Sequence, residues 1–205
     1  HNLYGVRIDA YSLWVDVQLP DETELCTIAV PCLLVYEVMN AIAEKGRVQV
    51  SMSLLGPDGC DGLEAFWKAA RQESWGQNHP DLQGASPAEL RNLIPIWMHL
   101  DGAEVYRDSE FVIWSWCSAV AEALNVFDYK FLYCFLPSMV MQMKSVWQKV
   151  NEAVTQLIGW DLGVCRLGVA PDSGFYGEPF AARSSQARLA GRKLPWTATF
   201  AGPKT

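Results

Sequence analysis

The sequence lacks the closely spaced cysteine pairs that mark zinc sites and redox motifs. No two cysteines form a CxxC pair, and the six stand at Cys26, Cys32, Cys60, Cys117, Cys134 and Cys165. This spacing matches neither a set of zinc ligands nor the disulfide framework of a small secreted domain. We therefore expect reduced thiols and an intracellular protein.

Histidine is equally scarce, which narrows the chemistry that the chain can perform. The only histidines are His1, His79 and His99, so a catalytic triad has few bases to draw on. A copper site at His1 would need a second histidine on the same face. The stretch GPDGCDG lacks the lysine and the preceding strand of a phosphate-binding loop. These patterns assign no catalytic residue, and we expect core or surface roles for His79 and His99.

The chain has no uninterrupted apolar run of the roughly 18 residues that a membrane helix needs. The longest candidates, residues 111–127 and 131–143, are interrupted by Glu122 and Pro137. We therefore expect a soluble or peripheral protein and not an integral membrane protein. Because the chain begins at His1 without a methionine or an apolar leader, we interpret it as processed or as a fragment.

The composition favours a folded domain with a large core. Of the 205 residues, 50% are apolar and 19% are charged, which argues against disorder. Nine tryptophans indicate core packing first, with a stacking or partner surface as the alternative. The net charge of -7 argues against a protein that coats nucleic acid over most of its surface.

The end of the chain reverses that charge balance. From Arg183 onward there is no acid, and the bases are Arg183, Arg188, Arg192, Lys193 and Lys204. A solvated tail and an anion or nucleic-acid contact both fit this composition. The candidate nucleic-acid contacts are Arg183, Arg188, Arg192 and Lys193.

Hydrophobic periodicity predicts a mainly helical N-terminal region over residues 1–90. Residues 1–20 alternate loosely and indicate extended structure. Residues 21–46 have acids in the first turn and apolar residues at helical spacing, which predicts a helix that starts or kinks at Pro31. Shorter helices are predicted at residues 63–73 and 86–93.

Residues 91–205 have a different pattern, rich in β-branched and aromatic residues. Three strand patterns, IPIWMHLDG, SEFVIWSWCSAV and KFLYCFLPS, are joined by short connections that favour antiparallel neighbours. A helix with one apolar face is predicted over residues 143–163, ending at Gly159 or Gly163, and PWTATFAG predicts a fourth strand. The order β-β-β-α-β is the opening half of a ribonuclease H-like fold. We therefore expect an α+β protein with a mixed sheet in this second region.

One acid in the second region, Asp101, stands where a ribonuclease H-like fold would hold a metal ligand. In ribonuclease H-like folds, carboxylates on the first and fourth strands hold divalent metal for phosphoryl transfer. Asp101 ends the first strand pattern and would be the first ligand, with Glu104 in reach as a further oxygen donor. A solvated turn is the alternative interpretation of both acids. Because FAGPKT has no acid after the fourth strand, we expect an inactive site with a remnant Mg or Mn ligand.

The second region contains four short motifs, IPIWMHLDG, WSWCS, DYKFL and FAGPKT. Within residues 63–203, the chain resembles a multicopy family of transposon-like proteins in dinoflagellate algae. Members of that family carry IPLxxHGDG, WSWxS, DxKxL and FAGxKxD. The resemblance implies that Asp101 is the first acid of a transposase core. The second acid of that core, the aspartate of FAGxKxD, has no counterpart in FAGPKT.

Two functions follow as hypotheses. The first is a truncated, inactive transposase-like core in the nucleus, whose only activity, if any, would be metal-dependent phosphoryl transfer. The second is a non-catalytic interaction subunit of a larger assembly, such as an organellar or photosynthetic complex. The second hypothesis predicts an exposed apolar patch that includes some of Trp67, Trp97, Trp114, Trp116 and Trp196.

Overall fold

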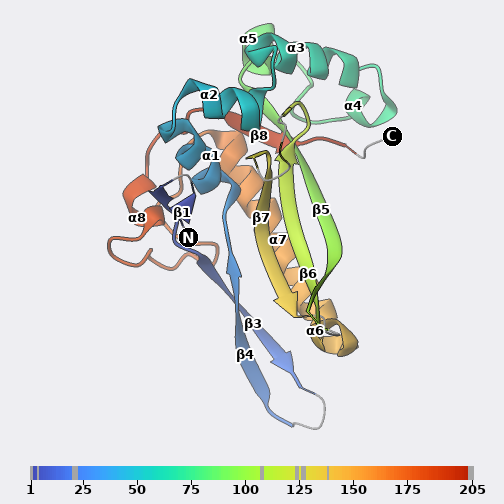
Figure 1. Ribbon diagram of the computed structural model, residues 1–205, viewed down its shortest axis with the longest axis vertical. Helices are drawn as coiled ribbons and strands as arrows, with labels where there is room; N and C mark the ends of the chain where they lie inside the picture. The colour runs from blue at the N-terminus through green and yellow to red at the C-terminus, as the bar shows by residue number, and fades with distance from the viewer. Residues whose placement is uncertain are drawn as a thin grey trace.

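Strands from both halves of the chain form one curled, mixed β-sheet. In this computed structural model the six strands lie in the order β3-β4-β7-β6-β5-β8 (Figure 1). Their bounds are β3 Tyr11–Gln18, β4 Leu25–Cys32, β5 Leu93–Tyr106, β6 Ser109–Ser118, β7 Lys130–Pro137 and β8 Thr197–Phe200. The structure describes residues 2–3, 5–19, 23–106, 109–122, 125, 128–137 and 139–202, and their side chains except at 2–3, 103–106, 109–110 and 141.

The second half of the chain supplies four of these strands and confirms the predicted order of elements. β5, β6 and β7 form an antiparallel meander, in which Asp101 of β5 lies opposite Ile113 of β6. β8 then returns beside β5 in the parallel direction, with Leu93 opposite Thr197. A parallel return of this kind needs a long crossover, which is made mainly by a helix between β7 and β8. The α+β class is therefore confirmed.

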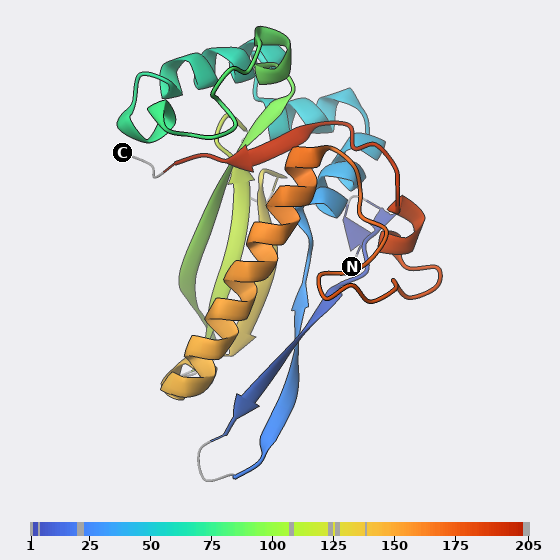
Figure 2. The ribbon, with the colours of Figure 1, turned by 180° about the vertical axis from the view of Figure 1, so that it is seen from behind.

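That crossover helix, α7 (Lys144–Leu167), covers one face of the sheet (Figure 2). Its buried apolar residues recur every three or four positions and include Val146, Val150, Val154 and Leu157. This spacing turns one stripe of the helix toward the sheet, as the sequence predicts. The predicted end at Gly159 or Gly163 is wrong, because the helix continues to Leu167, and Gly168 adopts the left-handed conformation at the C-cap.

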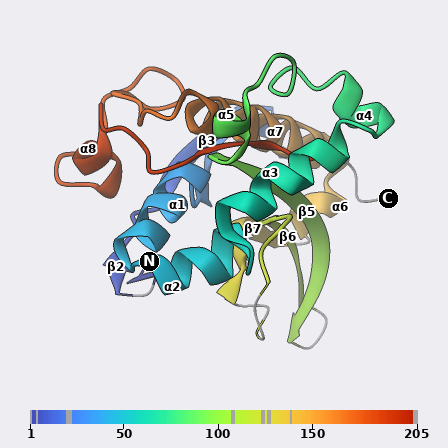
Figure 3. The same ribbon diagram turned by 90° about the horizontal axis from the view of Figure 1, so that it is seen from above.

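Shorter helices lie on both sides of the sheet, and Figure 3 shows α8 and α4 at opposite sides of the molecule. Their bounds are α1 Val35–Glu44, α2 Arg47–Val50, α3 Gly59–Ala70, α4 Ser74–Gln77, α5 Pro87–Leu90, α6 Met139–Gln142 and α8 Ser185–Leu189, with a π-helix η1 at Ser51–Leu55. Ser86 and Glu89 form a capping box at the start of α5, inside the helix that is predicted over residues 86–93. The strands β1 (Asn2–Leu3) and β2 (Val6–Arg7) form a separate two-stranded ribbon.

The predicted helix over residues 21–46 is wrong in its first part. β4 occupies that part and pairs with β3 along its whole length, from Leu25 opposite Gln18 to Cys32 opposite Tyr11. Residues of both strands alternate in exposure, and the pairing with β3 stabilises β4 as a strand. The apolar residues at helical spacing, from Leu34 to Ile42, lie after β4. The helix α1 begins only after the strand. The sheet thus draws strands from both sides of residue 90, and a domain boundary at that residue stays a prediction.

The interior contains several of the aromatic residues. Trp67 and Trp116 are fully buried, and Trp114 is 4% exposed. Trp116 packs against Phe131 of the neighbouring strand, with ring centroids 4.8 Å apart. The interpretation of the tryptophans as core residues is therefore confirmed for these three, and the expected exposed patch is wrong for them.

A backbone contact at Gly56 gives a test of this packing. Gly56 has a φ of 69°, and a Cβ there would collide with the carbonyl oxygen of Val120. We expect Gly56→Ala to lower the free energy of unfolding by about 2–5 kcal/mol, from left-handed strain and overpacking together. Gly84 has a similar φ of 74° but open space around it, so Gly84→Ala is the control and should cost about 1–2 kcal/mol. Urea unfolding that gives equal losses for both variants would contradict the close contact.

Candidate functional site

A buried carboxylate holds the start of α1 in place. Asp161 of α7 is fully buried, and its Oδ2 accepts a hydrogen bond of 2.7 Å from the backbone amide of Val35. Its Oδ1 accepts a longer bond of 3.4 Å from the amide of Tyr36. The preceding residue, Leu34, has no polar side-chain atom that could cap the helix. Asp161 therefore satisfies two amides that α1 cannot satisfy within itself.

A second buried carboxyl group lies on α1 itself. Glu37 is 2% exposed, and its Oε2 accepts a hydrogen bond of 2.8 Å from Nε2 of Gln186. Its Oε1 has no hydrogen-bond partner in the part of the chain that the structure describes. Burial raises the pKa of Glu37 from 4.5 to about 8, against the effect of its side-chain contacts with Ser185 and Gln186, and the charges of Asp161 and Asp9 act in the same direction as burial. At neutral pH this carboxyl group is therefore mostly protonated and can donate a hydrogen bond.

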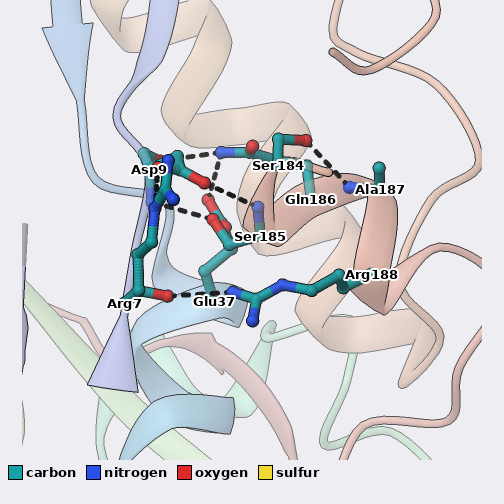
Figure 4. A network of polar contacts seen from close by, with 8 residues as sticks. All are labelled: Arg7, Asp9, Glu37, Ser184, Ser185, Gln186, Ala187 and Arg188. Carbon is teal, nitrogen blue, oxygen red and sulfur yellow. Dashed lines mark hydrogen bonds and ion pairs between the residues drawn. The ribbon is translucent and has the colours of Figure 1, made fainter. Parts of the chain in front are cut away.

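Polar contacts join the start of α8 to the segment after β2, as Figure 4 shows. The Asp9 amide donates to Oγ of Ser185 at 2.8 Å, and the Ser185 amide donates to Oδ2 of Asp9 at 2.9 Å. Gln186 Nε2 also donates to the backbone oxygen of Asp9 at 2.8 Å. Arg7 completes the network through a 2.8 Å ion pair with Oδ1 of Asp9. These reciprocal bonds fix α8 over Glu37.

A cavity of about 180 Å³ opens beside this network. Its lining combines three arginines with two acids and an amide, namely Arg7, Arg188, Arg192, Glu37, Glu44 and Asn40. Arg188 is held by a 3.2 Å hydrogen bond from its Nη2 to the backbone oxygen of Arg7. The Glu44 carboxylate accepts a 2.9 Å bond from Nδ2 of Asn40. Guanidinium groups beside a protonated carboxyl group can bind an anion that also accepts a hydrogen bond.

The predicted metal position lies on a different part of the sheet. Asp101 is exposed on β5, and β8 pairs with β5 only as far as Phe200 opposite Ile96. Among the described residues, no group of three or more His, Cys, Asp or Glu side chains could hold a metal ion. The Glu104 and Glu110 side chains and all of Asp108 lie outside the description. Metal binding by Asp101 with Glu104 stays a prediction.

The structure separates the four basic residues that the sequence groups together. Arg188 and Arg192 line the cavity, whereas Arg183 and Lys193 are exposed and do not line it. Lys204 lies outside the described residues. Nucleic-acid contact by these residues stays a prediction.

The two histidines that the structure describes, His79 and His99, occupy separate places. His79 Nε2 lies 2.8 Å from the backbone oxygen of Phe200 and its ring contacts Trp67 and Trp75. His99 Nε2 lies 3.5 Å from Sγ of Cys117 on the neighbouring strand. The His79 contacts fit the structural role that we expect for that residue.

Sequence patterns do not reveal the cavity. Its residues come from three segments that are far apart in the chain, and none of them forms a motif. One weak signal is Glu37, an acid inside the apolar stretch LLVYEVMNAI. An acid in such a stretch is almost never buried unless it has a partner, and that partner, Gln186, is supplied only by the fold.

Comparisons with known proteins leave the chain without an assigned family. No family model matches it, and no curated protein or solved structure is significantly similar to it. Within the described residues, no helix has both the length and the apolar character needed to cross a membrane.

The two buried acids predict how stability depends on pH. Burial raises the pKa of Asp161 from 3.8 to about 7, against the effect of its bonds to the Val35 and Tyr36 amides. The pKa of Glu37 rises from 4.5 to about 8. Between pH 3.8 and about pH 7 for Asp161, and between pH 4.5 and about pH 8 for Glu37, the folded chain binds more protons than the unfolded chain. The contribution of both groups to the free energy of unfolding therefore falls as pH rises and levels off above the folded pKa.

Asp161→Asn tests this sign, because asparagine keeps an acceptor oxygen and cannot ionise. We expect a flatter decline of the free energy of unfolding than in the wild type between pH 3.8 and about pH 7. Asp161→Ala should lower that free energy by about 2–4 kcal/mol, since two buried amides lose their acceptor. Urea unfolding followed by tryptophan fluorescence measures both effects. Glu44→Gln, an exposed change on α1, is the control, and an unchanged slope in Asp161→Asn would refute the assignment.

Proposed function

We propose that this chain is a ribonuclease H-like core of transposase-like type that does not catalyse phosphoryl transfer. The strand order β7-β6-β5-β8 supports the fold, with antiparallel pairing up to β5 and a parallel return of β8. The crossover by α7 and the sequence motifs of the dinoflagellate transposon-like family support the same proposal. The fold alone does not assign a function, so the argument depends on where the carboxylates stand.

The register between β5 and β8 is the observation that supports the absence of phosphoryl-transfer catalysis in this proposal. The paired positions are Leu93 to Ile96 on β5 and Thr197 to Phe200 on β8, and none of them is an acid. Asp101 lies five positions beyond the last pair, where β8 no longer runs beside β5. Two-metal catalysis needs carboxylates from neighbouring strands at metal-bridging distance. The described residues offer Asp101 no such partner from β8.

A metal and nuclease assay tests this proposal. With Mg or Mn present, we expect no cleavage of labelled DNA or RNA, in single-stranded or double-stranded form. If Asp101 is a remnant metal ligand, added Mn should raise the melting temperature of the wild type, and Asp101→Asn should abolish that increase. Metal-dependent cleavage that Asp101→Asn abolishes would overturn the proposal and restore Asp101 as a catalytic ligand.

A second candidate function is an interaction subunit, and the β3–β4 hairpin favours it. β4 pairs with β7 only at Cys32 opposite Cys134, and Figure 1 shows the hairpin projecting away from the rest of the sheet. The hairpin exposes two large apolar side chains, Trp14 at 56% and Leu25 at 70%. β3 is also an edge strand. An edge strand with apolar neighbours can pair with the same strand of a second copy.

Sedimentation over a range of protein concentrations tests self-association through the hairpin. We expect the wild type to form dimers, and the double variant Trp14→Ser, Leu25→Ser to shift the dissociation constant upward by about tenfold or more. Val48→Ser is the control, because Val48 is 75% exposed but lies on α2. A monomeric wild type, or an equal effect of the control, would rule out self-association through this hairpin.

A further inference from the structure

The cavity beside α8 has a buried polar group without a protein partner. Glu37 lines the cavity and is 2% exposed, yet its Oε1 has no hydrogen-bond partner among the described residues. Leaving a buried polar atom unsatisfied costs about 1–3 kcal/mol. The oxygen itself is shielded from solvent behind the cavity wall, so a molecule bound in the cavity would supply the missing hydrogen bond after a rotation of the Glu37 carboxyl group.

The outer part of the same cavity is cationic. Arg188 and Arg192 line it and are exposed at the surface, and Arg7 approaches from the other side. Asp9 compensates part of the Arg7 charge through their ion pair. Glu44 is the one exposed acid in the lining, and it is engaged by Asn40. A guanidinium group has five N–H donors. The hydrogen bond from Arg188 to the Arg7 backbone oxygen uses only Nη2 of that group.

The size of the cavity limits what can enter. Its volume of about 180 Å³ lies below the range of about 300–1,000 Å³ for sites that hold drug-sized ligands. A nucleotide, a peptide or an oligonucleotide would not fit inside it. A small metabolite with one or two anionic groups would fit.

We propose that this cavity binds a small organic anion, a carboxylate or phosphate that also bears a hydroxyl or carbonyl group. Its anionic group binds the guanidinium groups of Arg188 and Arg192 at the mouth. Its hydroxyl or carbonyl oxygen pairs with the Glu37 carboxyl group in the interior. Burial favours the protonated form of Glu37, so the interior offers a donor and no opposing charge.

The proposed site is independent of transposase-like ancestry. It is formed by β2, the segment after β2, α1 and the chain around α8, and it uses no residue of β5 to β8. The site also gives Arg188 and Arg192 a role other than nucleic-acid contact. A general basic surface would use all four exposed bases equally, whereas the cavity distinguishes two of them from Arg183 and Lys193.

Calorimetric titration with malate, glycerol phosphate and inorganic phosphate tests the proposal. We expect saturable binding of malate or glycerol phosphate at millimolar or lower concentration, and weaker binding of inorganic phosphate, which cannot reach Glu37 and the arginines together. Arg192→Gln and Arg188→Gln should each weaken binding by about tenfold or more, which equals about 1.4 kcal/mol. The matched controls, Lys193→Gln and Arg183→Gln, change the net charge equally and should leave the affinity within about twofold, about 0.4 kcal/mol.

Variants of Glu37 test the interior contact. Glu37→Gln keeps a donor and an acceptor and should retain binding, whereas Glu37→Met keeps the length of the side chain and should weaken binding about tenfold. Thermal unfolding of each variant checks that the chain is folded. Three results would overturn the proposal: no binding of any probe at millimolar concentration, an equal loss in the Lys193 and Arg183 controls, or unchanged affinity in Glu37→Met. Affinity for DNA that all four arginine and lysine variants reduce equally would favour the nucleic-acid surface instead.

Discussion

The rest of the structure depends on the contact between Asp161 and the first turn of α1. An α-helix begins with backbone amides that have no partner in the helix, and here the start of α1 lies in the core, away from water. A carboxylate supplies the acceptors and also interacts favourably with the positive end of the helix dipole. Because Asp161 belongs to α7, this contact fixes α1 against the helix that covers the sheet. The position of α1 then decides where Glu37 and the cavity lie.

The network around Glu37 shows how a small set of polar contacts can shape a surface site. Gln186 binds both the Glu37 carboxyl group and the backbone of Asp9, so α8 is tied to α1 and to the segment after β2 at once. Fully satisfied polar networks rigidify their surroundings, and unsatisfied members raise the energy of the fold. One oxygen of Glu37 lacks a partner beside an open, cationic cavity. A molecule that supplies this partner would stabilise the folded chain through its binding energy.

Sequence patterns predict the second half of the chain well, because its elements are strongly periodic and locally determined. The strands of the meander and the apolar stripe of α7 follow from neighbouring residues, and so does the capping box at Ser86 in the first region. The predicted helix over residues 21–46 fails at β4, because its helical spacing lies only in residues 34–42, whereas residues 25–32 alternate in exposure and pair with β3. A hairpin partner can override local preference, since strand stability comes from cross-strand contacts more than from the strand itself.

The amino-acid sequence by itself determined the composition of the core, the class of the fold and most of its elements, since burial and periodicity act over a few neighbouring residues. Only the tertiary structure decided that Asp161 caps α1, that β8 ends before it reaches Asp101, and that Arg7 and Arg188 face one cavity. The residues of each of these contacts stand far apart in the chain and share no motif. They come into contact because the sheet and its crossover helix bring their segments together, and no local sequence pattern predicts these contacts.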